Sequence, residues 1–196
     1  MNTQSLVFFG LVGSGKGTQI KLLADFLKTK FNTESLHAYP GNEYRKHIEA
    51  MDEVGKRVKD SMARGELQPD FLTNAIFANI LMNNLEDNIN LIADGYPRTI
   101  NQSENFLSQM SYFDRKNVRI VYITLSEEEA IKRNLLRGRA DDTHEGLKKR
   151  FDEYKNNVVP AMNFLKEKGM QVIEINGEQS IEDVHADILK ALNLNN

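Results

Sequence analysis

Residues Ser5 to Gln19 read SLVFFGLVGSGKGTQ, and this stretch decides the fold. The apolar run 6–9 predicts a strand covered on both faces, because such strands are continuously hydrophobic. The glycines that follow the run are Gly10, Gly13, Gly15 and Gly17. Helix-forming residues begin at Gln19, so we predict a strand, a glycine loop and a helix in succession.

The glycine loop fits the pattern G-x-x-x-x-G-K through Gly10, Gly15 and Lys16. Glycines let backbone N–H groups turn towards a phosphate, and the lysine adds a mobile positive charge. A purely structural turn is the alternative, but a strand before the loop and a helix after it favour phosphate binding. Gly17 replaces the usual Ser or Thr and Thr18 comes one position later, so the sequence does not establish direct hydroxyl ligation of magnesium, and a water can intervene instead.

The composition narrows the possible functions. A length of 196 residues suits one domain, and a net charge of −3 gives no general reason to bind nucleic acid or an anionic membrane. The absence of cysteine excludes disulfides, thiolate catalysis and cysteine-based zinc sites. The first apolar run is too short to span a bilayer and no basic residue precedes it. We therefore expect a cytoplasmic enzyme. We also expect a monomer that acts on small molecules, although composition does not determine the oligomeric state.

Strand and helix patterns alternate along the rest of the chain. Further strands are predicted at 35–41, 89–93, 118–125 and 170–175. Helices are predicted at 19–30, 69–85, 127–137, 143–168 and from Ser180 onwards, with a break near Val159 caused by Pro160. This order predicts an α/β fold, a five-stranded parallel sheet with helices on both faces and ligands at the carboxyl ends of its strands.

The polar segment 42–63 predicts short helices outside the sheet that serve as a mobile flap. Most of its charged residues favour a solvated face. Arg45 stands out because it follows Gly41 by one helical turn, close to a strand exit where ligands collect. His37, inside the preceding strand, is interpreted as a structural histidine, since the sequence shows no partner for proton transfer.

Strand 89–93 ends at Asp94, which places a carboxylate at the ligand-binding edge of the sheet. Together with a phosphate loop, such a carboxylate organises magnesium or its waters, and Arg98 just beyond it can clamp a phosphate through two hydrogen bonds. A helix cap is the alternative role for Asp94, but the Gly-Tyr-Pro-Arg turn does not resemble a helix start.

Arginines gather after the fourth predicted strand. Arg133, Arg137 and Arg139 lie close together in the sequence, and Arg150 follows from the next helix. A solvated face is one interpretation, but planar forked donors beside a glycine favour phosphate recognition.

Taken together, these motifs resemble adenylate kinases and related nucleoside monophosphate kinases over nearly the whole chain. GLVGSGKGTQ is similar to the phosphate loop of this family, with Val12 where proline is common. DGYPRT, residues 94–99, is similar to the family signature with tyrosine for phenylalanine, and GRADD with the later KKR is similar to its transfer-site arginines. The resemblance implies a single P-loop kinase domain, 1–196, with a helical monophosphate-binding segment inserted at about 40–69 and a minimal lid at about 137–141.

The resemblance also implies roles for individual residues. ATP, the phosphoryl donor, would be bound by Gly13, Ser14, Gly15, Lys16, Gly17, Thr18, Arg133 and Arg137. The acceptor nucleotide would be bound by Gly41, Arg45, Glu66, Leu67, Gln68, Gly95, Arg98, Gln102, Arg139 and Arg150. The catalytic residues would be Lys16, Arg98, Arg137, Arg139 and Arg150, and Asp94 would hold Mg²⁺ through water, with no zinc.

The implied reaction is ATP plus AMP to two ADP. AMP is favoured because the PRTxxQ pattern of Thr99 and Gln102 resembles the adenylate members, whereas UMP/CMP kinases replace that threonine. The family's Thr-Gly-Asp beside the monophosphate is Pro40-Gly41-Asn42 here, so a UMP/CMP kinase stays the alternative, ahead of a nucleotide-binding regulatory module. Only Gly138 separates Arg137 from Arg139, which implies a lidless enzyme.

Overall fold

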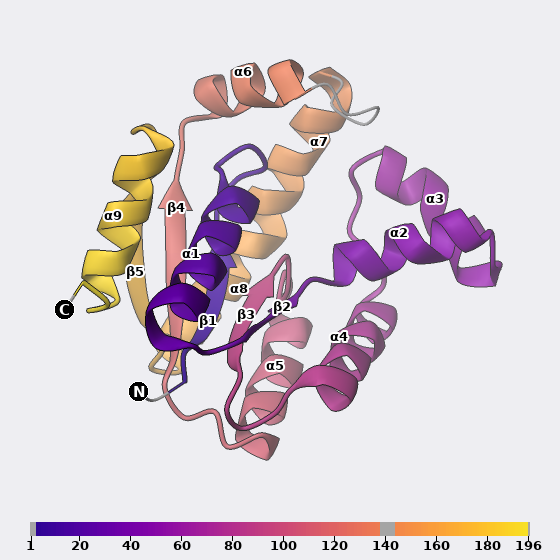
Figure 1. The fold of residues 1–196 in the computed structure, drawn as a ribbon. Helices are drawn as coiled ribbons and strands as arrows, with labels where there is room; N and C mark the ends of the chain where they lie inside the picture. Colours follow the sequence, from indigo (N-terminus) through magenta and orange to yellow (C-terminus); the bar gives the residue numbers. More distant parts are fainter. Residues whose placement is uncertain (1–2, 138–143, 196) are drawn as a thin grey trace.

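The computed structural model describes residues 3–137 and 144–195. The strands are β1 (Ser5–Phe9), β2 (Ser35–Ala38), β3 (Asn90–Asp94), β4 (Val118–Thr124) and β5 (Gln171–Asn176). They form one parallel sheet in the order β2-β3-β1-β4-β5, as Figure 1 shows. The predicted fold class is therefore confirmed.

Helices cover both faces of this sheet. The α-helices of the described residues are α1 (Lys16–Phe31), α2 (Pro40–Ala50), α3 (Glu53–Ala63), α4 (Asp70–Asn84), α5 (Ile100–Tyr112), α6 (Glu127–Arg137), α7 (His144–Glu153), α8 (Val159–Glu167) and α9 (Ile181–Ala191). Alternate residues of β1 point to opposite sides, so Leu6 and Phe8 join the core under α1 and α9. Val7 and Phe9 join the core under α4, α5 and α8.

The strand order creates a crevice between β1 and β3. The chain leaves β1 into α1 on one face, whereas it leaves the neighbouring β3 into α5 on the opposite face. In open parallel sheets, ligands bind where such connections diverge, at the carboxyl ends of the strands. The glycine loop and Asp94 lie at these two ends.

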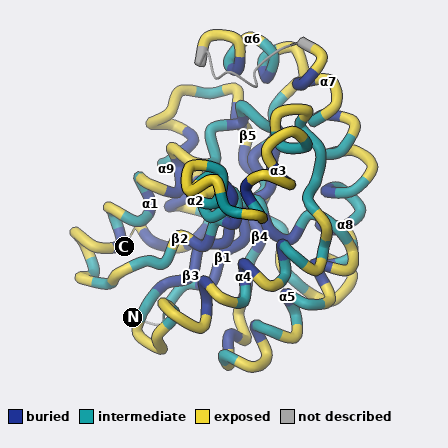
Figure 2. Tube along the Cα trace, turned by 90° about the vertical axis from the view of Figure 1, so that its right-hand side faces the viewer, coloured by how far each residue is buried: buried dark blue, intermediate teal, exposed yellow. Residues whose placement is uncertain are grey.

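Helices α2 and α3 form an arm that extends away from the sheet (Figure 1), and exposed segments are frequent along it (Figure 2). This confirms the predicted helices outside the sheet. The predicted strand 35–41 is too long, because β2 ends at Ala38 and Pro40 opens α2. Proline is well suited to the first helical turn, where its missing N–H is not needed.

Two helix boundaries differ from or refine the sequence prediction. Helix α1 begins at Lys16 and not at Gln19, because Gly15 adopts a φ of +87° and ends the loop there. The predicted break near Val159 is confirmed, since a π-helical turn, Tyr154–Val158, separates α7 from α8. Pro160 follows in the first turn of α8 and has no N–H to continue the α-helical pattern.

Within residues 3–137 and 144–195, none of the helices has both the length and the apolar character needed to cross a membrane.

Candidate active site

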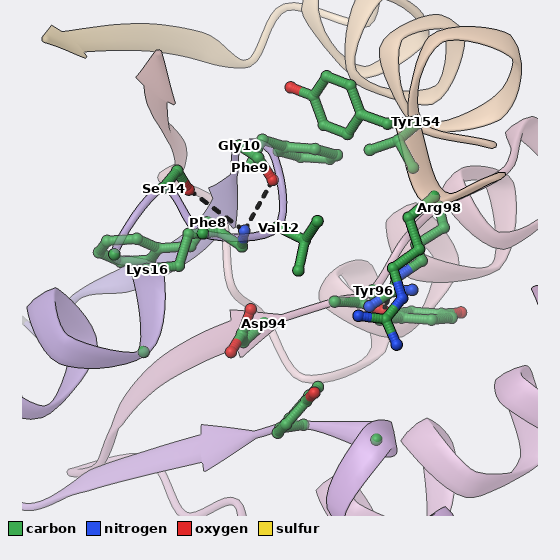
Figure 3. Close-up of a pocket in the computed structure, with 18 of the residues that line it drawn as sticks. Phe8, Phe9, Gly10, Val12, Ser14, Lys16, Asp94, Tyr96, Arg98 and Tyr154 are labelled. Carbon is green, nitrogen blue, oxygen red and sulfur yellow. Dashed lines mark hydrogen bonds between the residues drawn. The ribbon is translucent and has the colours of Figure 1, made fainter. Parts of the chain in front are cut away.

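A cavity of about 1020 Å³ opens at the carboxyl ends of β1 and β3. It is bounded by the glycine loop, the residues after β3, the arm and α7, and Figure 3 shows Lys16, Asp94 and Arg98 reaching it from different elements. Every predicted site residue whose side chain is described, from Gly13 to Arg150, lines this cavity. These residues are far apart along the chain, and the fold brings them together with further lining residues that the sequence did not single out.

The glycine loop has a backbone that other residues cannot adopt without strain. Gly13 and Gly15 have φ values of +90° and +87°, and a Cβ at Gly10 would lie 2.6 Å from the carbonyl oxygen of Ile123. No side chain in the described part of the chain caps the N-terminus of α1. The positive end of this helix dipole therefore faces the cavity without a competing side chain, which suits an anion such as phosphate.

Lys16 bends back over the loop. Its ammonium donates hydrogen bonds to the carbonyl oxygen of Gly10 at 2.7 Å and to the hydroxyl of Ser14 at 3.4 Å, both drawn in Figure 3, and to the carbonyl oxygen of Leu11 at 3.0 Å. These acceptors are neutral, and they hold the ammonium over the loop. The charge lies where a phosphate would enter the loop.

Asp94 is buried at the end of β3 and remains ionised. Burial by itself would raise the pKa of its carboxyl group, but the hydrogen bond from His37 and the positive charges of Lys16 and Arg98 outweigh it and lower the pKa. His37 Nε2 lies 3.3 Å from Asp94 Oδ2. The sequence shows no partner for His37, but the parallel pairing of β2 with β3 brings Asp94 beside it. The interpretation of His37 as a structural histidine stays a prediction.

The described residues contain no cluster of three or more histidine, aspartate or glutamate side chains that would hold a metal. Magnesium does not require one, since it is usually bound by one or two carboxylates together with water and substrate phosphates. A single ionised carboxylate facing a phosphate loop fits that arrangement.

Arg98 and Gln102 belong to one hydrogen-bonded network after β3. The Arg98 side chain donates from Nε to the Gly95 carbonyl at 2.9 Å, and its backbone N–H donates to Gln102 Oε1 at 2.8 Å. Gln102 Nε2 donates to Asp70 Oδ1 at 2.8 Å, and Thr99 caps α5 while donating to the same carboxylate. The buried Gln102 amide thus has one partner at each end and keeps a further hydrogen-bonding position at each.

Tyr96 replaces the phenylalanine that is common in the family signature. Its ring is buried and stacks on Phe77 with centroids 4.1 Å apart, while its hydroxyl donates to Asn74 Oδ1 at 2.8 Å. The added hydroxyl is therefore satisfied inside the core, and burial raises its pKa.

At the root of the arm, Arg45 is held by neutral groups. Its guanidinium donates to the Gly41 carbonyl and to Asn42 Oδ1, each at 3.0 Å, and to the Tyr39 hydroxyl at 3.2 Å. Sequence reasoning missed Tyr39. The sequence feature that could have identified Tyr39 is its position as a bulky aromatic residue directly before Pro40-Gly41, at the exit of a strand.

The segment that follows α3 meets α7 across the cavity. A Cβ at Gly65 would lie 2.7 Å from Arg150 Cγ and 3.0 Å from the Gly146 carbonyl oxygen. Glu66, Leu67 and Gln68 continue the lining, and the Gln68 amide accepts from Ser61 and donates to the Glu66 backbone. The arm and Arg150 are therefore brought together.

On the opposite side, Arg133 fixes its guanidinium beside the residues after β5. It donates to Glu129 Oε1 at 2.8 Å and to the Gly177 carbonyl at 2.9 Å. Sequence reasoning missed Asn134, which is fully buried and donates to the carbonyls of Val12 at 2.9 Å and Ala130 at 2.7 Å. Nothing in the sequence distinguishes this asparagine from an exposed helical one.

Two predicted catalytic residues cannot be placed in this cavity. Arg139 and the predicted lid residues 138–141 lie outside the described residues, as does the side chain of Arg137.

The comparisons with known proteins agree with this geometry. The family model described as adenylate kinase matches residues 8–170. An adenylate kinase of Prochlorococcus marinus strain AS9601 is 37% identical over 184 residues, covering 93% of this chain and 95% of the relative. An adenylate kinase of Oenococcus oeni is 32% identical, covering 91% and 93%. One of Dehalococcoides mccartyi is 30% identical, covering 96% and 97%. A glycine loop, a buried carboxylate and several arginines converge in one cavity, and the chain belongs to the adenylate kinase family of nucleoside monophosphate kinases.

Proposed function

We propose that this protein catalyses the reversible, magnesium-dependent transfer of a phosphoryl group from ATP to AMP, giving two ADP. The observation that carries the proposal is the convergence of Lys16, Asp94 and Arg98 in one cavity at the diverging ends of β1 and β3. An oxygen of the AMP phosphate attacks the γ-phosphorus of ATP while the bond to the ADP leaving oxygen breaks. Positioning and charge neutralisation provide the catalysis in such a transfer.

The donor phosphates would lie on the loop from Gly13 to Thr18. The N-terminus of α1 and the Lys16 ammonium supply positive charge there, and Lys16 exchanges its carbonyl partners for phosphate oxygens. Arg133, held by Glu129 and Gly177, would stack on the donor base.

Asp94 would hold Mg²⁺ through water, because it is the ionised carboxylate beside the loop. When bound, magnesium neutralises charge that develops on the phosphate oxygens. Thr18 lines the same cavity and is exposed to further water molecules.

The acceptor phosphate would lie between Arg45 and Arg98. Gln102 would read the adenine edge with the hydrogen-bonding positions that Arg98 and Asp70 leave open. A base with a different edge would leave a buried amide group unpaired, which costs affinity. Gly41, Gly95 and residues 66–68 would enclose the nucleoside.

The family resemblance assigns the remaining charge neutralisation to Arg137, Arg139 and Arg150. Of these, Arg150 lines the cavity from α7 and lies against Gly65 of the arm. This contact supports closure of the site by the arm.

The alignment with the Dehalococcoides relative spans 218 positions, more than this chain has residues, so that relative contains residues without a counterpart here.

An assay with ATP and a panel of nucleoside monophosphates tests the acceptor. We expect the highest kcat/KM with AMP and loss of activity when magnesium is chelated. Higher kcat/KM with CMP or UMP would overturn the AMP assignment in favour of a UMP/CMP kinase. Absence of transfer to every monophosphate would overturn the kinase assignment itself.

A second assay tests the proposed short lid. Without a separate lid, shielding of the donor side is incomplete, so we expect measurable ADP release from ATP without AMP, and use of GTP in place of ATP. Undetectable hydrolysis together with strict rejection of GTP would show that another element closes the donor site.

A further inference from the structure

Tyr39 fills the space between the two glycines that border the acceptor side of the cavity. It is the residue before α2, in extended conformation. A Cβ at Gly41 would lie 2.5 Å from Tyr39 Cζ, and a Cβ at Gly95 would lie 3.1 Å from Tyr39 Cε2. The ring is therefore packed against both the root of the arm and the turn after β3.

The guanidinium of Arg45 lies over the Tyr39 ring. The guanidinium carbon lies 5.4 Å from the ring centroid, and Nη2 donates to the Tyr39 hydroxyl at 3.2 Å. The imidazole of His37 stacks parallel to the same ring, with centroids 5.8 Å apart and an angle of 9° between the planes. Since His37 also contacts Asp94, the ring links the arginine of the arm to the fixed edge of the sheet.

The charge of Arg45 is not cancelled by these contacts. Its acceptors are the Gly41 carbonyl, the Asn42 side-chain amide and the Tyr39 hydroxyl, all neutral. Within the described residues Arg45 forms no ion pair with a carboxylate. The guanidinium is thus held by shape and by neutral hydrogen bonds while its full positive charge stays available to an anion.

We propose that Tyr39 is a positioning residue that fixes Arg45 for the phosphate of the acceptor nucleotide. This inference rests on the proposed function and deepens it. The ring and its hydroxyl hold the guanidinium in place before phosphate arrives, which reduces the entropy lost on binding. The phenol also supplies a hydroxyl beside Arg45, in a chain that has Pro40 at the position of the family's threonine.

Kinetics of Tyr39→Leu and Tyr39→Phe test this role. Tyr39→Leu removes both the aromatic face and the hydroxyl, so the KM for AMP should rise about tenfold. Tyr39→Phe keeps the face and should raise it only about threefold. In both variants the KM for ATP should change less than about twofold, whereas a merely structural defect would impair both substrates. Tyr112→Leu is the control, because Tyr112 is 84% exposed on α5 and outside the cavity.

A double-mutant cycle with Arg45→Ala tests whether Tyr39 acts through Arg45. In that background Tyr39→Leu should raise the KM for AMP less than about twofold further. A persisting tenfold effect, or an equal rise in the KM for ATP, would overturn the inference. If Tyr39→Leu does not fold, an unchanged KM for AMP in Tyr39→Phe would overturn it equally.

Calorimetry with AMP separates this inference from the proposed function. If the wild-type protein transfers phosphate to AMP and both Tyr39 variants bind AMP as tightly as the wild type, the role of Tyr39 is refuted and the proposed reaction stands. A wild-type protein that binds AMP without transferring phosphate refutes the proposed reaction, and the Tyr39 variants must then weaken that binding for the inference to stand. Absence of both transfer and binding refutes both.

Discussion

Replacement of Lys16 by methionine tests the central charge of the site. The change keeps an unbranched side chain of similar length and removes the ammonium that donates to Gly10, Leu11 and Ser14. Loss of a charge contact made in the transition state costs about 3 to 4 kcal/mol, so kcat should fall roughly a hundred- to a thousandfold.

The effect on stability should be much smaller. Lys16 is partly exposed and its partners are carbonyl and hydroxyl groups at the mouth of the cavity, where water can replace the lost donor. A net cost of about 1 kcal/mol corresponds to a fall in Tm of about 2 to 4 °C for a chain of this size.

Initial rates with ATP and AMP, measured beside thermal melting curves, distinguish the two effects. Lys28→Met is the matched control, because Lys28 lies on the same helix and pairs only at the surface with Glu34, at 2.8 Å. Its rate and Tm should stay close to wild type. Near-normal turnover of Lys16→Met would refute the role of Lys16 in transfer, and a large loss of Tm would show that it acts mainly in folding.

Three further predictions follow from single residues. Arg98→Ala should lower kcat/KM about a hundred- to a thousandfold with little change in Tm. Arg57→Ala is the control, because Arg57 is exposed, and it should match wild type; equal kcat/KM in both variants would contradict the role of Arg98. Asn134→Leu removes the donor to the Val12 carbonyl, so it should cost about 1 to 3 kcal/mol in urea unfolding and raise the KM for ATP more than that for AMP; unchanged stability would contradict it. Burial lowers the pKa of His185 below its ordinary value of 6.5, so the unfolded chain binds more protons and stability should fall as the pH drops below 6.5. His185→Phe should therefore show a smaller fall in Tm between about pH 7.5 and 5.5 than the wild type. An identical fall in both proteins would contradict this prediction.

Local patterns in the sequence were sufficient to predict the five strands, most of the helices and many of the residues that line the cavity, but not helix α5. Hydrophobic runs, the spacing of Gly10, Gly15 and Lys16, and the position of Asp94 at a strand end each depend on neighbours along the chain. The parallel sheet then brings the strand ends to one edge, so residues predicted separately meet there. The boundaries of β2 and α1 were less accurate, because Pro40 and Gly15 are compatible with both a turn and a helix start.

Contacts between distant segments were decided only by the tertiary structure. His37 meets Asp94 through strand pairing, Asn134 reaches Val12 from α6, and Gly65 of the arm meets Arg150. Tyr39 belongs to the same class, since its role depends on a ring seated against Gly95 after another strand. Sequence periodicity predicts which face of an element is apolar. It does not predict which residue of another element a single polar or aromatic side chain will contact, because that depends on how the elements pack.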